Sequence, residues 1–213
     1  CATGNYIHVC AHKERVKETL DEELTNMGIE YKYQKCGTTK NMDIIIIRNK
    51  ELFDYFRPLS VGAINKKLPE WVWQLKTEYC KILIEGLILG DGYKNKSGVY
   101  LYYTSSKKLA DDVSRLALHA GWSGNIRTRK DMEDGTKFVI RGKEYKRNAD
   151  ALEITINRLK NEPMLNHGHT KAQHGQSEEW IDFDDDVYCC SVPNETIYLR
   201  LNGKPVWTGN SRH

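Results

Sequence analysis

The chain has 213 residues, of which 39% are hydrophobic and 29% are charged, and its formal net charge is +3. This composition is ordinary for a globular protein and allows one large domain or two modest ones. Because the net charge is small, any affinity for nucleic acid must come from local clusters of basic residues. The six cysteines form no Cys-x-x-Cys pair, and the polar first residues are no signal peptide, so we expect an intracellular protein that is not secreted.

The first predicted unit, residues 1–69, starts with a strand at Gly4–Val9 and continues into an amphipathic helix that ends at Gly28. The apolar stripe of that helix consists of Val16, Leu20, Leu24 and Met27. A hairpin follows, in which Ile29–Tyr33 pairs with Asp43–Ile47. The unit closes on Lys66-Lys67-Leu68-Pro69.

A second helix is predicted around the apolar run Leu83–Gly92, which ends in an aspartate between two glycines. Gly86 and Gly90 share one helix face, where they allow a partner helix to approach closely. Such contact would bring Asp91 beside an equivalent carboxylate, and paired carboxylates suit a divalent metal. A buried helix that runs into a Gly-Asp-Gly turn explains the same residues. The run is too short for a membrane span and contains Glu85, so no membrane partner is expected.

The second predicted unit, residues 76–163, repeats the first. A strand around Tyr100 leads into a helix that ends at Gly121, with Ser105 or Ser106 as its N-cap. The strands that follow are Gly124–Lys130, which pairs with Lys137–Ile140, and then Ala151–Ile156. Four pairs of residues all differ by 94 positions: Gly4/Gly98, Tyr6/Tyr100, Lys13/Lys107 and Lys66/Lys160. A constant offset across several elements indicates an internal duplication.

Basic residues are concentrated in the hairpin of the second unit, between positions 126 and 147. On a twisted hairpin such residues can follow DNA phosphates, and some can reach base edges in the major groove. A solvated hairpin without a ligand is the plain alternative. The candidate DNA-binding residues are Arg127, Arg129, Lys130, Lys137, Arg141 and Lys143.

The segment Ile84–Gly92 resembles the dodecapeptide of the LAGLIDADG homing endonucleases, and the two-unit organisation is similar to their αββαββα repeat. The resemblance covers residues 1–163 and implies an α+β fold of two pseudo-symmetric halves with a saddle-shaped sheet on double-stranded DNA. It implies that Asp91 binds Mg²⁺ and that Gly86 and Gly90 lie in the helix interface. Lys66 and Lys160 match the lysines that this family places near the scissile phosphates. The first helix of the duplication, with its acidic residue, is expected immediately upstream of Cys1.

The composition changes after Pro163. Residues 164–177 are predicted to be a connecting loop, in which three histidines lack a fourth metal ligand at a recognisable spacing. Two strand-like runs follow, Val187–Val192 and Thr196–Leu201, with a turn at Asn202-Gly203. Residues 178–210 resemble the C-terminal splicing region of an intein, a Hint-type domain. Many inteins carry a LAGLIDADG endonuclease between the two halves of the splicing domain.

The intein resemblance implies roles for three residues of the tail. Asn210 cyclises to break the C-terminal junction, Ser211 receives the acyl group, and Cys189 stands where the family often has Asp or Cys. Gly209 and Glu195 replace histidines that are common in this family, which predicts slow cleavage. Residues 211–213 would begin the host protein, for which the second-largest RNA polymerase subunit is the expectation.

The expected function is therefore that of an intein fragment with an endonuclease. Its expected partners are double-stranded DNA, the missing N-terminal part of the intein and the flanks of the host protein. Alone, the fragment should neither cut nor splice efficiently, because it lacks one catalytic acid and the N-terminal splicing half. The alternative is a catalytically inactive DNA- or RNA-binding module, such as a maturase-like or degenerate insertion.

Overall fold

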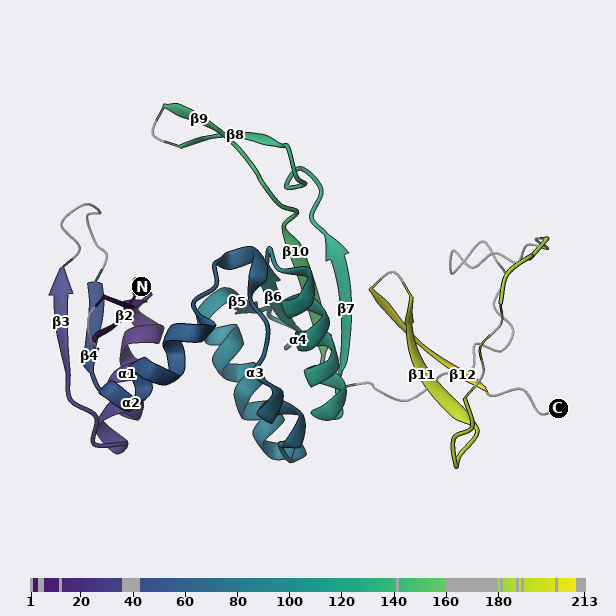
Figure 1. The fold of residues 1–213 in the computed structure, drawn as a ribbon, viewed down its shortest axis with the longest axis horizontal. Coiled ribbons are helices and arrows are strands. Elements are labelled where there is room, and N and C mark those ends of the chain that lie inside the picture. Colours follow the sequence, from purple (N-terminus) through teal and green to yellow (C-terminus); the bar gives the residue numbers. More distant parts are fainter. Residues whose placement is uncertain are drawn as a thin grey trace.

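The computed structural model describes residues 2–3, 6–11, 13–35, 43–140, 142–159, 180, 182–186, 188, 190–201 and 203–209. Two α/β units lie side by side, a thin β-ribbon stands away from the second unit, and a hairpin near the C-terminal end lies beyond it (Figure 1). The mixed α+β architecture agrees with the prediction.

The first unit contains one antiparallel sheet with the strand order β1-β2-β4-β3. Its elements are β1 (Ala2–Thr3), β2 (Tyr6–Ala11), α1 (Glu14–Asn26), β3 (Tyr31–Lys35), β4 (Asp43–Arg48) and α2 (Lys50–Phe56). Three members of the predicted stripe of α1, Val16, Leu20 and Leu24, pack on the sheet. The fourth, Met27, follows the helix and is 64% exposed. Three short 3-10 helices, Arg57–Leu59, Ala63–Asn65 and Glu70–Gln74, lead to the second unit.

The second unit repeats this topology with the strand order β5-β6-β10-β7. Its elements are α3 (Thr77–Asp91), β5 (Gly92–Lys94), β6 (Tyr100–Thr104), α4 (Lys107–His119), β7 (Ser123–Thr128) and β10 (Leu152–Asn157). Helices α3 and α4 cover one face of the sheet, with Ile84, Val113 and Ile154 buried between them. The predicted hairpin Ile29–Tyr33 with Asp43–Ile47 is confirmed in the first unit, because β3 pairs with β4.

The duplication is confirmed, but its offset in the strands is 93 and not the predicted 94. Tyr6 is 39% exposed, whereas Tyr100 is 5% exposed, so these two side chains lie on opposite faces of their sheets. Ile7 packs toward the core of the first unit and is the counterpart of Tyr100. A slip of one residue exchanges the two faces of a strand, so the offset of 94 would place polar residues in the core.

The helices follow the same offset of 93. Lys13 is the N-cap of α1, and Ser106 is the N-cap of α4, so Lys13 corresponds to Ser106 and not to Lys107. The Ser106 hydroxyl accepts a hydrogen bond of 3.1 Å from the Leu109 amide, as predicted for an N-cap. Gly28 and Gly121 end the two helices in the left-handed conformation with φ of +67° and +75°.

The last strands of the two units differ by a larger offset. Ile7 pairs with Ile47, and its counterpart Tyr100 pairs with Ile156. Ile47 and Ile156 are therefore also counterparts, and they are 109 positions apart, which is 16 more than the offset of 93. The 16 additional residues lie between β7 and β10 and contain the ribbon β8 (Lys137–Ile140) and β9 (Lys143–Lys146). The predicted pairing of Lys137–Ile140 with Gly124–Lys130 is wrong, because β8 pairs with β9 and β7 pairs with β10.

In the tail, β11 (Thr196–Leu201) and β12 (Lys204–Gly209) form an antiparallel hairpin. The predicted strand Thr196–Leu201 is therefore confirmed. The run Val187–Val192 is not a strand where the structure describes it, at 188 and 190–192. Among the described residues, no helix is both long and apolar enough to cross a membrane.

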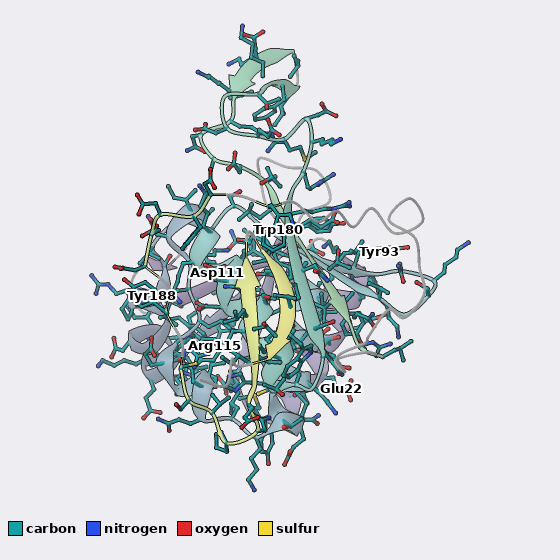
Figure 2. The ribbon with its side chains drawn as sticks, turned by 90° about the vertical axis from the view of Figure 1, so that its right-hand side faces the viewer. Glu22, Tyr93, Asp111, Arg115, Trp180 and Tyr188 are labelled. Carbon is teal, nitrogen blue, oxygen red and sulfur yellow. The ribbon has the colours of Figure 1, made fainter. Side chains whose placement is uncertain are left out.

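The tail hairpin is attached to the second unit at two points. The Ile126 amide of β7 donates a hydrogen bond of 2.8 Å to the Gly203 carbonyl. Arg200 and Asp111 form an ion pair of 2.7 Å, and Figure 2 shows Asp111 of α4 beside the hairpin. A Cβ atom at Gly203 would lie 2.7 Å from the Ile126 carbonyl oxygen, so this close approach requires glycine.

Candidate active site

Asp91 is the last residue of α3, and the close packing of Gly92 fixes its position. A Cβ atom on Gly92 would lie 2.6 Å from the Ile88 Cα and 2.8 Å from the Leu101 carbonyl oxygen. Only glycine allows the end of α3 to come this near to β6. The second glycine of the Gly-Asp-Gly turn therefore has a steric role, and the Asp91 side chain remains exposed at the helix end.

Two cations of the first unit bind the C-terminal end of α3. The Lys13 ammonium donates a hydrogen bond of 2.8 Å to the Gly90 carbonyl. The Arg15 guanidinium donates to the carbonyls of Leu89 and Gly92 at 3.3 and 3.0 Å. The carbonyls of Leu89 and Gly90 belong to the last turn of α3, where the negative end of the helix dipole lies, so cations stabilise them. Sequence reasoning did not predict this role, because it depends on how the two units pack.

Lys66 is held in place by the beginning of α4. The Ser106 hydroxyl donates a hydrogen bond of 2.6 Å to the Lys66 carbonyl. Two residues further along, the Leu68 amide donates to the buried Asp112 carboxylate at 3.0 Å. Asp112 also pairs with Lys108 at 2.5 Å. Sequence reasoning missed Ser106 and Asp112 as supports for Lys66, because they are 40 and more residues away in the chain.

Asp91, Lys66 and Arg129 line one shared cavity of ≈ 250 Å³. Its other lining residues come from the 3-10 helix, from β6 and the turn after it, and from the start of β10: Ala63, Tyr102, Tyr103, Thr104, Ser105, Ala151 and Leu152. The Arg129 guanidinium lies over the Tyr103 ring at 5.2 Å, which orients this cation at the rim. The structure thus brings together three residues that were singled out for separate reasons.

Tyr102 cannot act as a base in this cavity at neutral pH. Burial raises the pKa of its phenol to about 12, and the negative charge of Asp91 contributes to the rise. The hydroxyl therefore stays protonated and uncharged. The charged groups that line the cavity are the carboxylate of Asp91 and the cations of Lys66 and Arg129.

The residues of the cavity fit a magnesium ion in part. Mg²⁺ is commonly held by one or two carboxylates together with substrate phosphates, and Asp91 supplies one carboxylate. The described residues contain no group of three or more His, Cys, Asp or Glu side chains that could hold a metal. A site built on Asp91 therefore needs oxygen atoms from bound phosphate or from a second acidic residue.

The face of α3 that carries Gly86 and Gly90, called here the glycine face, is not covered by another element within the described residues. No atom lies within 4 Å of where a Cβ atom would stand on Gly86 or Gly90, apart from the helix's own backbone. Tyr79 and Ile82 continue this face and are 54% and 62% exposed. The close helix contact for which these glycines were predicted is absent within the described residues.

The core of the first unit is open in the region that is equivalent to the one covered by α3 in the second unit. An apolar cavity of ≈ 430 Å³ is lined by side chains that include Ile7, Leu20, Leu24 and Met27. Their counterparts at an offset of 93 are all buried in the core of the second unit: Tyr100, Val113, Ala117 and Ala120. In the second unit, α3 covers this region through Cys80, Ile84 and Ile88.

Strand register locates the position that corresponds to Asp91. Ile7 pairs with Ala2 of β1, and its counterpart Tyr100 pairs with Lys94 of β5. Ala2 therefore corresponds to Lys94, and the counterpart of Asp91 falls two positions before Cys1.

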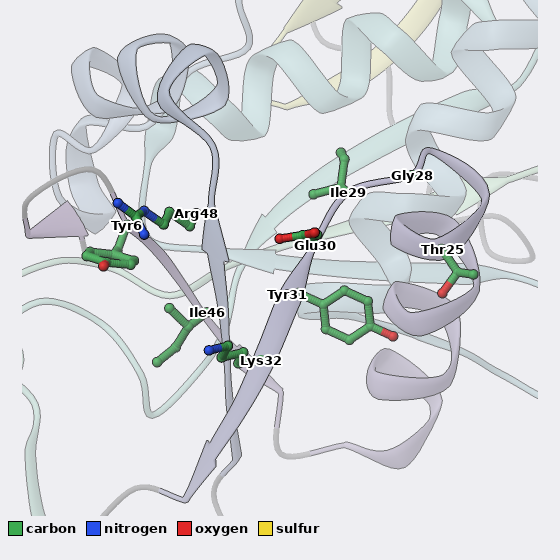
Figure 3. Close-up of a pocket in the computed structure, with 9 residues that line it drawn as sticks. All are labelled: Tyr6, Thr25, Gly28, Ile29, Glu30, Tyr31, Lys32, Ile46 and Arg48. Carbon is green, nitrogen blue, oxygen red and sulfur yellow. The ribbon is translucent and has the colours of Figure 1, made fainter.

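The outer face of the first sheet carries cations and an aromatic ring. Lys32 pairs with Ile46 across β3 and β4, and Tyr6 pairs with Arg48 across β2 and β4. The Arg48 guanidinium lies 5.8 Å from the centre of the Tyr6 ring, and Figure 3 shows the two side chains close together. Sequence reasoning did not single out Lys32 or Arg48, because they are isolated basic residues in the sequence.

The predicted DNA-binding residues are spread over two places. Arg127 forms an ion pair of 2.6 Å with the buried Glu153, and Arg129 lines the cavity. Lys130 is exposed, Lys137 pairs with Glu144 at 2.9 Å, and Lys143 is exposed on the ribbon. They do not form one continuous face of a single hairpin.

Five of the predicted site residues lie outside the described residues: Lys160, Arg141, Cys189, Asn210 and Ser211. The offset of 94 that paired Lys66 with Lys160 is not supported, since counterparts after the second hairpin differ by 109.

Residues 78–153 match the LAGLIDADG-like domain family. This span includes most of α3, with Asp91, and ends in β10.

Two relatives match nearly the whole chain. The DNA-directed RNA polymerase subunit beta C-terminal section of Stigeoclonium helveticum is 36% identical over 234 residues, which cover 97% of this chain and 20% of that protein. The ATP-dependent Clp protease proteolytic subunit of Chlamydomonas moewusii is 25% identical over 287 residues, which cover 93% of this chain and 28% of that protein. The chain therefore spans less than a third of the length of these relatives.

The chain is also similar to solved structures of the homing endonuclease I-DmoI. Mesophilic variants of I-DmoI align with 72% of this chain and 73% of that chain, at 14% identity and a TM-score of 0.46. I-DmoI in complex with DNA and Mn aligns with 71% of this chain and 73% of that chain, at 14% identity and a TM-score of 0.45.

Proposed function

We propose that this chain is the C-terminal part of an intein that carries a LAGLIDADG homing endonuclease, and that the complete protein cuts double-stranded DNA with Mg²⁺. The observation that supports the nuclease best is the cavity shared by Asp91, Lys66 and Arg129. Most of it lies within the segment that matches the LAGLIDADG-like domain family.

Each charged residue of the cavity has a task in this proposal. Lys66 and Arg129 bind the scissile phosphate and stabilise the negative charge that develops on it. Asp91, together with phosphate oxygens, would hold Mg²⁺, which supplies a more acidic bound water and further charge stabilisation. Tyr102 stays protonated beside Asp91 because of its raised pKa, so it contributes no base.

The outer faces of the two sheets are the proposed DNA surface. Both faces combine cations with aromatic rings, through Arg48 and Tyr6 in the first unit and through Arg129 and Tyr103 in the second. Such residues follow phosphates and stack on sugars or bases. Lys13 and Arg15 tie the end of α3, which carries Asp91, to the first unit.

The apolar cavity of the first unit supports the proposed helix upstream of Cys1. A helix placed there as α3 is placed in the second unit would cover the exposed apolar residues, and its last acid would be two positions before Cys1. The glycine face of α3 is the surface that this helix would contact. The second acid needed at the metal would come from the same segment.

The proposal that the chain is an insertion rests on its relatives. Nearly the whole chain aligns with parts of two proteins that have unrelated names, an RNA polymerase subunit and a Clp protease subunit. An element that inserts into different host genes produces this pattern. The first of these relatives also agrees with an RNA polymerase subunit as the host.

In the splicing part of the proposal, Asn210 cyclises and Ser211 accepts the acyl group, with Cys189 as a further participant. The hairpin β11–β12 supports it, because its second strand ends at Gly209, immediately before Asn210. In the complete gene product, Asn210→Ala should prevent release of the peptide that begins at Ser211, as measured by mass spectrometry. Lys66→Met should leave that release unchanged, and release that survives Asn210→Ala contradicts the splicing role.

The nuclease is tested with a chain that carries a copy of residues 70–92 joined directly to Cys1. Its target is a pool of supercoiled plasmids with randomised inserts. We expect nicking that requires Mg²⁺ and that falls at least about 100-fold with Asp91→Asn, while DNA binding is kept. Glu78→Gln, at the other end of α3, is the matched control. DNA binding without any nicking favours the alternative, a catalytically inactive DNA-binding module.

A further inference from the structure

The ribbon β8–β9 has no counterpart among the described residues of the first unit. It lies within the 16 residues by which the second hairpin exceeds the first, and Figure 1 shows it standing away from both sheets. Two backbone hydrogen bonds close the base of the ribbon, and both involve Arg147. The Arg147 amide donates to the Thr136 carbonyl at 2.9 Å, and the Gly135 amide donates to the Arg147 carbonyl at 3.0 Å.

The two faces of the ribbon differ in chemistry. One face, defined by the cross-strand pairs Phe138/Tyr145 and Ile140/Lys143, is called here the aromatic face. Phe138 and Tyr145 stack at 5.8 Å, and the Arg147 guanidinium lies 5.0 Å from the Phe138 ring. Among the described residues this face carries no carboxylate.

The opposite face carries Val139 and the ion pair between Lys137 and Glu144. Glu144 would repel a phosphate backbone, whereas the aromatic face offers cations and apolar groups alone. Ile140 on the aromatic face is 51% exposed and Tyr145 is 46% exposed. A folded chain leaves such side chains in solvent at a cost, and a ligand that covers them removes that cost.

The base of the ribbon begins at the candidate active site. Arg129, which lines the cavity with Asp91, donates its amide to the Ala151 carbonyl at 2.8 Å where β7 and β10 lead into the ribbon. DNA that occupies the cavity would therefore continue toward the ribbon. A two-stranded antiparallel ribbon fits the width of the major groove.

We propose that the aromatic face of β8–β9 enters the major groove of DNA on the side of the second unit only, and that Ile140 contacts a thymine methyl group. This inference rests on the proposed DNA-binding function and adds an asymmetry to it. The four residue pairs of the ribbon span about 14 Å, at about 3.4 Å per residue. That length corresponds to about four base pairs of DNA.

A shortened variant tests the asymmetry. Replacing residues 137–146 with Asn-Gly keeps the Thr136–Arg147 pair and closes it with a two-residue turn. Both full-length proteins are footprinted with hydroxyl radicals on duplexes that the unaltered chain selects from a randomised 40-base-pair pool. We expect the shortened variant to lose protection of about four base pairs at one end of the footprint and none at the other.

Three outcomes decide the test. A footprint that is unchanged by the shortening overturns the proposal but leaves DNA binding intact. A shortened variant that keeps its footprint and loses self-association in sedimentation identifies the ribbon as a protein contact, which also overturns it. Failure of the unaltered chain to select any duplex contradicts the proposed function itself.

Replacing thymine with uracil tests the contact of Ile140. Removal of the methyl groups from the four base pairs at the ribbon should weaken binding of the unaltered chain about threefold to fivefold. Ile140→Ser should bind both duplexes equally, whereas Val139→Ser, on the opposite face, should keep the preference for thymine. Equal sensitivity of both variants to uracil contradicts the assigned face.

Discussion

The two units share a topology, but their apolar cores are buried to different extents. In the first unit α1 lies on the sheet, and the edge of its core opens into an apolar cavity of ≈ 430 Å³. In the second unit the corresponding residues are closed off by α3, whose Ile84 is fully buried. Strand order and helix ends are thus encoded within each strand-helix-strand-strand segment, whereas burial depends on one additional helix.

The largest expected effect is produced by supplying that helix to the first unit. Joining a copy of residues 70–92 to Cys1 should stabilise the first unit by about 4 kcal/mol, because three aliphatic or thiol side chains become buried. Amide hydrogen exchange followed by mass spectrometry should show slower exchange in α1 and β4. Exchange in α4 should stay unchanged, and equal slowing in both units would contradict the assigned place of the helix.

Asp112 offers the next largest contrast between the units. Its buried carboxylate accepts the Leu68 amide, so Asp112→Ala should destabilise the second unit by about 3 kcal/mol in urea unfolding. Its counterpart at an offset of 93 is Thr19, whose hydroxyl donates to the Arg15 carbonyl within α1. Thr19→Ala should change stability by less than about 0.5 kcal/mol. Comparable losses of unfolding free energy in the two variants would show that the bond from Leu68 to Asp112 does not stabilise the second unit.

Gly86 within α3 and Gly92 immediately after it differ in how closely they are packed. Gly92→Ala should destabilise the second unit by about 2 to 3 kcal/mol, because the added Cβ atom meets the Ile88 Cα and the Leu101 carbonyl. The Cβ atom added by Gly86→Ala would contact no described atom outside the helix backbone, so this substitution should stabilise α3 by about 1 kcal/mol in this chain. In the chain with the added helix, the gain from Gly86→Ala should disappear. Thermal unfolding measures all three changes.

The smallest expected contrast depends on pH. The pKa of Tyr102 is raised from an ordinary value of 10 to about 12, so folding favours its protonated form. This contribution is fully present below pH 10 and is lost as the pH rises from 10 to 12, by roughly 2 kcal/mol. Tyr102→Phe should lack this part of the alkaline loss in urea unfolding at pH 9 and pH 11.5. The counterpart Val9 cannot ionise, so this position contributes nothing comparable in the first unit.

Sequence patterns predicted the elements well and their partners less well. The N-cap Ser106 and the glycines that end the helices are local signals, and both are confirmed. The apolar stripe of α1 is confirmed for Val16, Leu20 and Leu24, whereas Met27 follows the helix and is 64% exposed. The offset was wrong by one because similar residues at Tyr6 and Tyr100 matched across a change of face. The strand Lys137–Ile140 was paired with the wrong partner because it belongs to a ribbon inserted between β7 and β10. Such an insertion does not change the alternation of apolar and polar residues in the strands on either side of it.

The candidate site could be predicted in its chemistry but not in its supports. Asp91 and Lys66 follow from the motif and the spacing, and they do lie on one cavity. Lys13 and Arg15 could not be assigned, since they act through carbonyls of a helix more than 70 residues away. Long-range polar contacts of this kind leave no periodicity in the sequence.

The attachment of β11–β12 has a mechanical consequence. Gly203 abuts the backbone of β7, and Arg200 is tied to Asp111 on α4, so the strand that precedes Asn210 starts from a fixed support. Tension from a polypeptide that continues beyond this strand would reach the sheet of the second unit first, and the open first unit would be shielded from it.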